Sequence, residues 1–286
     1  MILQKDIIKI AQSQGVPKTT VDKDWVLGHF IDTIFSIDEL KSVLIFKGGT
    51  ALRKCWFENY RFSEDLDFTS TNHDFVLTRK RLELICERLT NSIQLPTHIE
   101  SLREQRHNNQ VMGFEAIIKF WGADHPANEN PPPAERWLTK IKIEITINEK
   151  VVFEPVLKSI SHPYPDTLTY NAPIPCYCLE EVITEKLRAL IQRSYTAPRD
   201  YYDLWYILSK DIELAKAHIK AAFIEKLNFK GHDFTGIEQL INPENNRVVG
   251  KAWQNSLVHQ IKKNELPSFE EVSMYLEKEI KTLLQK

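Results

Sequence analysis

Two aspartates separated by a single residue, Asp65 and Asp67, are the residues of this sequence best suited to catalysis. Alternate side chains on a strand point to one face, so both carboxylates would share a face while Leu66 and Phe68 point into the core. Paired oxygen ligands on a rigid strand suit Mg²⁺, which keeps several waters and takes its other ligands from substrate phosphates. Two such ions can hold the attacking and leaving oxygens of a phosphoryl transfer. The pair therefore indicates metal-dependent chemistry on a phosphate.

The segment before these aspartates strengthens this prediction, because an Asp-x-Asp pair alone also occurs in calcium loops and on ordinary solvated strands. An apolar run at 43–46 is followed by Lys47-Gly48-Gly49-Thr50, at the start of an expected helix. Glycines let the backbone approach a ligand closely, and amides at the start of a helix suit phosphate. We therefore expect Gly48, Gly49 and Thr50 to bind a nucleotide beside the metal site. The sequence contains neither a P-loop motif nor a dinucleotide-binding glycine motif.

A third carboxylate would complete such a site, and Glu144 is the candidate. It lies on the polar face of residues 140–148, where isoleucines alternate with polar residues as in a half-buried strand. If this strand is next to the one that carries Asp65 and Asp67, Glu144 could bind the metal or activate an attacking hydroxyl. A surface charge on a half-exposed strand is the alternative, and the sequence leaves both open.

A second group of charged residues begins the C-terminal part of the chain. Lys186 lies among the apolar residues of an expected helix, and a lysine there can reach triphosphate oxygens as a point charge. Arg199 and Asp200 could instead be a structural pair at the start of the next helix, with Asp200 as its cap. For Asp200 and Asp203 the sequence leaves functional and structural roles open.

Hydrophobic periodicity gives the elements that must position these residues. Helices are predicted at 3–13, 20–36, 51–57, 73–91, 179–193, 200–208, 213–227, 249–262 and 268–285. Strands are predicted at 43–46, 66–69, 97–103, 111–121 and 140–148. Thr19 or Thr20 would cap the second helix, and the proline-containing segment 122–136 would be an exposed hairpin connection.

The stretch 155–175 is rich in proline, serine and histidine and has little periodicity, so we place the domain boundary there. Strands and helices precede it, and only helices follow. The predicted fold is α+β, with a mixed-sheet domain at 1–165 and an α-helical bundle domain at 166–286.

The composition is that of a soluble globular protein and limits the partners. Of the 286 residues, 42% are apolar and 27% are charged, and the formal net charge is −2. The pI is about 6.5, so no global basic field attracts nucleic acid. Contacts to RNA would have to come from local basic residues, and the candidates are Lys80, Arg81, Arg88, Arg103 and Arg106.

The four cysteines lack paired CxxC spacing, and the chain is too long to need a disulfide framework. Cys176 and Cys178 could form part of a zinc site with His162, although alternating positions in an apolar run are explained more simply as reduced thiols. The N-terminal residues show no signal-peptide pattern, and no apolar run approaches membrane-spanning length. We therefore expect a cytoplasmic protein.

The order of these motifs resembles that of the AbiEii/AbiGii toxin family of nucleotidyltransferases. The resemblance rests on four segments, which are Gly48-Gly49-Thr50-Ala51-Leu52, Arg61-x-Ser63-x-Asp65-Leu66-Asp67-Phe68, Glu185-Lys186-Leu187-Arg188-Ala189 and Arg199-Asp200-Tyr201-Tyr202-Asp203-Leu204. The segment Val21-Asp22-Lys23-Asp24-Trp25-Val26-Leu27 is similar more loosely. The resemblance spans most of the chain, apart from the region around 92–136.

This resemblance implies a polymerase-β-like palm domain joined to a helical bundle, in the toxin of a type IV toxin–antitoxin or phage-defence system. It also implies transfer of NMP from an NTP, in some members onto the acceptor end of tRNA, and a separately encoded antitoxin. By position, Ser63 and Asp65 would lie at the nucleotide and metal site, Asp67 at the metal, Lys186 at the phosphates and Asp203 beside them.

We therefore expect a metal-dependent nucleotidyltransferase whose catalytic residues are Asp65, Asp67, Glu144, Lys186 and Asp203. Asp65, Asp67 and Glu144 would bind Mg²⁺, with Mn²⁺ as an alternative ion. Many relatives carry aspartate where this chain has Glu144, and its longer side chain sets this site apart. The expected partners are an NTP, RNA with tRNA foremost, and an antitoxin, without a membrane. The alternatives are transfer to a protein or small molecule, and a module that binds NTP or RNA without turnover.

Overall fold

The computed structural model describes residues 2–126, 128–193, 197–262 and 264–285. Its contacts divide the chain into two compact units. The sheet unit comprises residues 1–149 and 155–176, and the helical unit comprises residues 150–154 and 177–286. The chain therefore enters the helical unit briefly after residue 149, returns to the sheet unit, and leaves it again after residue 176. The single boundary expected after residue 165 stays a prediction.

The sheet unit is built on a mixed sheet of seven strands in the order β3-β4-β5-β2-β1-β7-β6. The strands are β1 (Leu44–Lys47), β2 (Asp65–Ser70), β3 (Thr97–His107), β4 (Gln110–Phe120), β5 (Lys140–Thr146), β6 (Val156–Lys158) and β7 (Ile174–Cys176). β2 runs parallel to β5 and β1 runs parallel to β7, whereas the other neighbouring strands are antiparallel. β2 therefore lies inside the sheet, with hydrogen-bonded neighbours on both edges.

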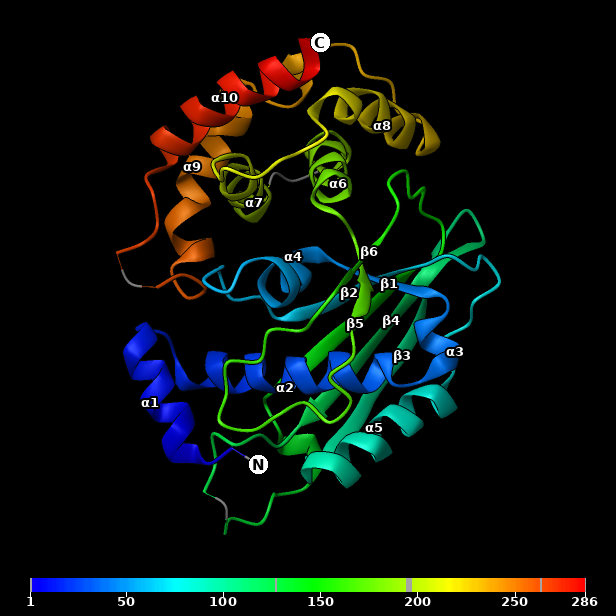
Figure 1. Cartoon of the computed structure of the whole chain (residues 1–286), viewed down its shortest axis with the longest axis vertical. Helices are drawn as coiled ribbons and strands as arrows, with labels where there is room; N and C mark the ends of the chain where they lie inside the picture. The colour runs from blue at the N-terminus through cyan, green and yellow to red at the C-terminus, as the bar shows by residue number, and fades with distance from the viewer. Residues whose placement is uncertain (1, 127, 194–196, 263, 286) are drawn as a thin grey trace. The chain divides into compact units, whose positions relative to one another are not determined.

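The sheet unit also contains helices and short helical turns. They are α1 (Gln4–Gln14), α2 (Lys18–Phe35), α3 (Asp38–Lys41), α4 (Gly48–Ala51), a π-helical turn η1 (Leu52–Trp56), α5 (Arg79–Ile93) and a 3-10 turn η2 (Ala134–Arg136). α2 and α5 contact each other and lie together across the strands (Figure 1). Residues 24–35 of α2 are all buried, and the ring of Phe35 lies 5.9 Å from that of Phe68 on β2. The core therefore lies between α2 and the Phe68 face of the sheet.

The helical unit consists of helices packed on one another, as predicted. They are α6 (Leu179–Gln192), α7 (Pro198–Leu208), α8 (Lys216–Phe229), α9 (Pro243–Leu257) and α10 (Phe269–Gln285), with a 3-10 turn η3 (Ile237–Gln239). α6 packs against α7 and α8, and α10 packs against α7, α8 and α9. Within the described residues, no helix is both long and apolar enough to span a membrane.

A buried ion pair fastens the short segment 150–154 into the helical unit. The ammonium of Lys226 lies 2.5 Å from the carboxylate of Glu181, and both side chains are fully buried. Lys226 also donates a hydrogen bond to the carbonyl of Lys150, and Glu181 accepts the amides of Val152 and Phe153. These backbone groups complete the hydrogen bonding that a buried ion pair needs to be stable.

α2 starts earlier than the sequence predicted. Its first residue is Lys18 and Pro17 occupies the N-cap position, so Thr19 and Thr20 lie inside the helix and neither of them caps it. The carbonyl of Pro17 accepts the amides of Thr20 and Val21, which begins the helix. The prediction failed because it sought a side-chain cap, whereas here only backbone groups begin the helix.

Other boundaries differ because periodicity does not reveal turns and strand pairing. α5 begins at Arg79 rather than at residue 73, because the side chain of Thr78 accepts the amide of Arg81 and caps the helix there. The stretch 155–175 is not structureless, since it contains β6 and the first part of β7. β3 extends to His107, four residues beyond the predicted end at 103, because it pairs with β4 along its length.

Asp22 on α2 is a buried carboxylate that holds the chain after β4. One of its oxygens accepts the amide of Ala123 at 2.7 Å, and the other has no hydrogen-bond partner among the described residues. Burial, and after it the charge of Asp124, raises the pKa of Asp22 to about 7.

We expect the free energy of unfolding of the sheet unit to fall as the pH rises from about 4 to about 7. The folded protein keeps a proton on Asp22 over this range, whereas the unfolded chain, with an ordinary carboxyl pKa of 3.8, has released it. The slope from this group approaches about 1.4 kcal/mol per pH unit. Urea unfolding between pH 4 and 8 measures it.

Asp22→Asn should remove this component of the slope, because an amide carries no titratable proton. Asp74→Asn, which changes an exposed carboxylate of the same unit, is the matched control and should leave the slope in place. Identical pH profiles for the wild type and Asp22→Asn would contradict the prediction.

Candidate active site

β2 carries Asp65 and Asp67 in the arrangement that the sequence predicted. Leu66 and Phe68 are fully buried in the core, whereas the two aspartates are half-buried on the opposite face. Because β2 is hydrogen-bonded on both edges, its two carboxylates are fixed in direction by the sheet.

A row of charged residues crosses five strands through Asp67. Residues directly opposite each other in neighbouring strands share a face of the sheet. In this register the row, which we call the charged row, consists of Lys47, Asp67, Glu144, Glu115 and Arg103. Glu144 is thus the direct neighbour of Asp67, which meets the condition on which its predicted role depended. Its role as a metal ligand stays a prediction.

Glu115 is a member of the charged row that the sequence analysis missed. Its side chain is 10% exposed, and the guanidinium of Arg103 pairs with it at 2.5 Å. The strand 110–120 alternates poorly, since residues 113–116 are all buried, so periodicity could not single out one carboxylate there. Only the register of β4 against β5 brings Glu115 beside Glu144.

Lys142 is the cation held by these carboxylates, and it too was missed as a site residue. Its ammonium lies 2.8 Å from Glu144 and 3.7 Å from Asp65. Burial works against this charge, but the hydrogen bond to Glu144 and the charges of Asp65, Glu144 and Asp67 outweigh burial and raise the pKa of Lys142. The amide of Gln105 donates a second hydrogen bond to Glu144 at 3.0 Å. The cluster is therefore a place of concentrated negative charge that attracts a cation.

The glycine turn lies directly against the two aspartates. Gly48 has a φ of +79°, and a Cβ built there would lie 2.2 Å from a carboxylate oxygen of Asp67. A Cβ on Gly49 would lie 2.9 Å from Nη2 of Arg61 and 3.0 Å from the hydroxyl of Ser63. The structure thus brings the predicted residues Gly48, Gly49 and Ser63 together with Asp67, and both glycines are needed for this close approach.

Thr50 has a structural contact within this site. Its side chain is fully buried, and its hydroxyl donates a hydrogen bond to the backbone carbonyl of Asp65 at 2.5 Å. The helix predicted from residue 51 in fact begins at Gly48, because the positive φ of that glycine turns the chain directly from β1 into α4. Thr50 therefore fastens α4 to β2, and a direct contact with a nucleotide stays a prediction.

A buried network centred on Asp24 fixes the turn after α4. The two carboxylate oxygens of Asp24 lie 2.7 Å from the guanidinium of Arg53 and 2.7 Å from the ammonium of Lys54. Burial alone would raise the pKa of Asp24, but the charges of Lys54 and Arg53, with hydrogen bonds from Lys54 and Tyr164, hold it well below its ordinary value. This carboxylate is therefore ionised and joins α2 to η1.

The predicted residues Lys186 and Asp203 lie in the helical unit, where the structure brings them together. The ammonium of Lys186 on α6 lies 2.6 Å from Asp200 and 2.7 Å from Asp203 on α7. Both carboxylates are buried, and Arg193 also pairs with Asp200. The prediction that Asp200 caps a helix is wrong, because α7 begins at Pro198 and the Asp200 side chain is used in these ion pairs.

A model of one protein family matches the part of the chain that contains these groups. Residues 29–274 match the family described as nucleotidyl transferase AbiEii toxin, of type IV toxin–antitoxin systems. The chain belongs to this family. The matched range includes β2, the glycine turn and the Lys186 cluster.

The fold of this AbiEii-family chain is similar to that of a solved toxin. MenT4, a nucleotidyltransferase toxin of Mycobacterium tuberculosis, matches with a TM-score of 0.60 and 15% identity, over 100% of this chain and 99% of that one. This likeness confirms the α+β fold class. An antigenic nucleotidyltransferase-like protein from Paracoccidioides brasiliensis matches at a TM-score of 0.31 and 12% identity, over 86% and 96%, which supports no structural argument. A comparison with curated proteins gave no match.

Four of the five basic residues considered for RNA contact already have partners. Arg81 pairs with Glu39, Arg103 with Glu115, and Arg106 with Glu104. Arg88 donates hydrogen bonds to the carbonyl and hydroxyl of Ser36. Exposed ion pairs are weak, so Arg81, Arg103 and Arg106 remain available to phosphates, but they do not form an unbalanced basic patch.

The zinc site considered for Cys176, Cys178 and His162 is wrong. Among the described residues, the group of three potential metal ligands that come within 4.8 Å of one another is His29, His162 and Asp166. Cys176 ends β7, where it is buried and interacts with Cys55. His162 is therefore in a potential metal site, but without the cysteines.

We predict that Gly48→Ala abolishes nucleotide transfer because the new methyl group would displace the carboxylate of Asp67. A side chain at positive φ also costs about 1–2 kcal/mol, so strain alone must be separated from displacement. Gly231→Ala is the matched control, because Gly231 has a φ of +74° and a Cβ there meets nothing within 4 Å. Nucleotide transfer and thermal midpoints of both variants test this.

The expected result is a similar loss of stability in both variants and a loss of activity in Gly48→Ala only. Equal activities of the two variants would show that Gly48 is needed only for its positive φ, and not for the space beside Asp67.

Proposed function

We propose that this AbiEii-family enzyme transfers NMP from an NTP to a hydroxyl group of RNA, with the 3′ end of tRNA as the first acceptor to test. The observation that carries the proposal is the placement of Gly48 against Asp67, with Glu144 in register beside it. It puts a turn suited to phosphate next to three carboxylates on one face of a sheet.

The residues of the sheet unit fit Mg²⁺ by their chemistry. Asp65, Asp67 and Glu144 offer hard oxygen ligands, and the raised pKa of Lys142 reports the negative charge that they share. Lys142 and Gln105 hold Glu144 at present, so Glu144 would join the ion only by exchanging these contacts. We assign Asp65 and Asp67 as the principal ligands and Glu144 as the third, with Mn²⁺ as the alternative ion.

In the proposed reaction, the acceptor hydroxyl forms a bond to the α-phosphorus while the bond to the β-phosphate oxygen breaks, and pyrophosphate leaves with that electron pair. Bound metal ions neutralise phosphate charge and favour ionisation of the hydroxyl. Arg61 and Ser63 lie beside Gly49, where they can donate hydrogen bonds to phosphate oxygens that enter the turn. Acceptance of the proton of the attacking hydroxyl is the alternative role that we propose for Glu144, in place of metal binding.

Lys186 supplies a fixed positive charge in this proposal. Its ammonium is oriented by two buried carboxylates, Asp200 and Asp203, which restrict its freedom before any ligand binds. We assign Lys186 to the phosphates of the NTP and Asp203 to its orientation. A lysine held in this way loses less conformational entropy on binding than a free side chain.

RNA is proposed as the acceptor because the resemblance to the AbiEii/AbiGii family implies, for some members, transfer onto the acceptor end of tRNA. Transfer to a protein or a small molecule is the second candidate. We propose that a separately encoded antitoxin inhibits the enzyme. We also propose that the enzyme acts in phage abortive infection and is cytoplasmic. Incubation with each labelled NTP, Mg²⁺ and either total RNA, tRNA or protein extract distinguishes the acceptors.

We predict that Asp65→Asn and Asp67→Asn each lower nucleotide transfer at least about a hundredfold, comparable to removing a group that stabilises transition-state charge. The shape of each side chain is kept, so the fold should survive, and lower repulsion among the carboxylates should leave the thermal midpoint unchanged or raised without metal. Label incorporation and circular dichroism measure the two effects.

Asp74→Asn, an exposed change in the same unit, is the control and should retain full activity. An Asp65→Asn variant that transfers nucleotide at the wild-type rate would refute the proposed site.

Lys186→Met should reduce the use of NTP roughly ten- to a hundredfold, the value of a lost charge-assisted phosphate contact. It should also destabilise the helical unit, because it leaves Asp203 and Asp200 buried with one cation fewer. The double variant Lys186→Met/Asp200→Asn removes one of these charges and separates the two effects. Recovery of stability without recovery of NTP binding, measured by calorimetry, supports the phosphate role, and recovery of both contradicts it.

A further inference from the structure

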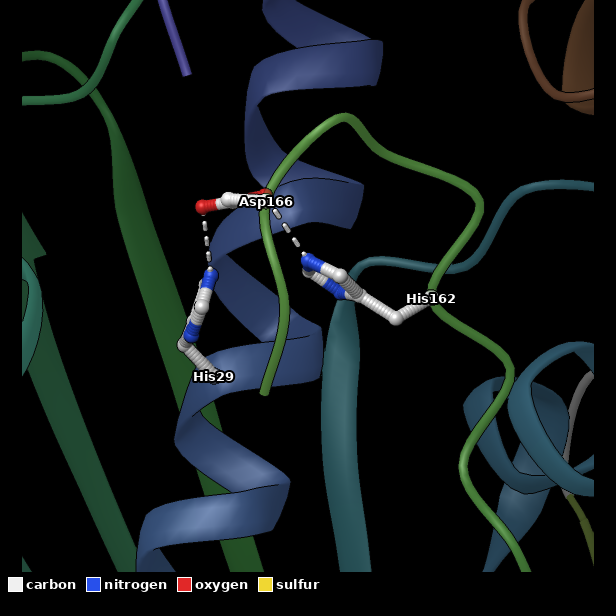
Figure 2. Close-up of side chains that lie close together, drawn as sticks. All are labelled: His29, His162 and Asp166. Carbon is white, nitrogen blue, oxygen red and sulfur yellow. Dashed lines mark hydrogen bonds and ion pairs between the residues drawn. The ribbon is translucent and has the colours of Figure 1, made fainter. Parts of the chain in front are cut away.

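The sheet unit contains a second polar cluster, which consists of two histidines and one aspartate and includes none of the carboxylates of β2. Figure 2 shows His29 on α2 facing His162 and Asp166 on the long connection 159–173 between β6 and β7. Nε2 of His29 lies 3.3 Å from one carboxylate oxygen of Asp166, and Nε2 of His162 lies 3.1 Å from the other. The three side chains can each offer a ligand atom within 4.8 Å of the other two.

The donor set suits a borderline divalent ion such as Zn²⁺. Two imidazole nitrogens and one carboxylate form the protein side of known zinc sites, with water as a fourth ligand. Both imidazoles are nearly enclosed, and the Asp166 side chain is 12% exposed, which leaves a route to solvent. Mg²⁺ prefers oxygen ligands and six-fold geometry, so this cluster differs in selectivity from Asp65 and Asp67.

Two neighbours support the cluster from outside. The indole Nε1 of Trp25 donates hydrogen bonds to both oxygens of Asp166, at 3.1 and 3.0 Å. Such donors behind a ligating carboxylate fix its orientation in metal sites. Gly28 allows the imidazole of His162 to lie against α2, because a Cβ there would lie 2.7 Å from its Nδ1 atom.

The cluster lies in the middle of a series of contacts between the connection 159–173 and α2. Between His162 and Asp166, the hydroxyl of Tyr164 donates to Asp24 at 2.6 Å. After Asp166, the amides of Tyr170 and Asn171 donate to Asp32 at 2.9 and 2.8 Å. No helix or strand lies within 159–173, so these side-chain contacts help to fix its position.

We propose that His29, His162 and Asp166 bind one Zn²⁺-type divalent ion, which fastens the connection 159–173 to α2. This structural metal site is separate from the proposed nucleotidyl transfer and does not depend on it. In the alternative, the three residues bind no metal and the two histidines only form hydrogen bonds with Asp166. The proposed site takes up one metal ion per chain, whereas the alternative takes up none.

The test uses the full chain, stripped with chelator and titrated with Zn²⁺ in the presence of millimolar Mg²⁺. We expect one tightly held Zn²⁺ per chain after gel filtration, measured by elemental analysis. At a hundredfold excess over its dissociation constant, Zn²⁺ should raise the thermal midpoint by about 5 °C or more. Co²⁺ in its place should give a spectrum of nitrogen and oxygen ligands without a thiolate charge-transfer band.

His162→Gln and Asp166→Asn should reduce the bound Zn²⁺ from one equivalent to nearly none and remove the thermal shift. Both substitutions keep similar size and hydrogen-bonding capacity, so circular dichroism should show folded protein. His73→Gln is the control for the loss of a histidine outside the cluster, because His73 instead contacts the carbonyl of Ile147. This variant should still bind one equivalent of Zn²⁺.

Trp25→Phe should weaken Zn²⁺ binding about ten- to a hundredfold, the usual effect of losing a supporting donor. Its matched control is Trp253→Phe, since Trp253 is also buried and donates to the carbonyl of Pro267 in the helical unit. Unsaturable binding, displacement by Mg²⁺, a thiolate band with Co²⁺, or undiminished binding by His162→Gln and Asp166→Asn would each overturn the proposal.

Discussion

The ion pairs of Asp24 with Arg53 and Lys54 cross from α2 to the turn that follows the glycine motif. A buried charge stabilises a fold only when its partners are close and its remaining hydrogen bonds are made, so these three side chains allow few arrangements of α2 and η1. Arg53 and Lys54 are consecutive in sequence, and the π-helical turn lets both reach one carboxylate. The position of Gly48 and Gly49, and through them the space beside Asp67, depends on this network.

The same helix organises the irregular part of the sheet unit. α2 is buried all round over residues 24–35. Three of its polar residues, Asp24, His29 and Asp32, contact the connection between β6 and β7 or η1. Polar groups in such a helix are costly unless they are satisfied, so they specify which segments must pack there. The segment Val21–Leu27, similar only loosely to the family motif, thus supports the site from behind.

Much of the fold and part of the site could be predicted, because both follow from local periodicity. Alternation along 140–148 identified β5, and the spacing of Asp65 and Asp67 identified their shared face. Glu115 escaped notice because its neighbour Glu144 comes from strand register, which a single sequence does not contain. Lys142 lies two residues from Glu144 on the same strand, but only the register of β5 against β2 brings it near Asp65. The His29 cluster escaped for the same reason, since His29 and Asp166 lie far apart in the chain and meet only through the packing of the connection on α2.

The segment 150–154 has a consequence for how this protein could be rearranged in evolution. Most of the helical unit is one continuous stretch, residues 177–286, which resembles a module that recombination could move to another protein. Its core, however, holds the Glu181–Lys226 pair, whose hydrogen bonds come from Lys150, Val152 and Phe153. A bundle transplanted from residue 166 or 177 onward would carry two buried charges without those donors and acceptors. Because residues 150–154 of the helical unit come before the last part of the sheet unit in the sequence, recombination cannot separate the two units with a single cut. We therefore expect the two units to be inherited together.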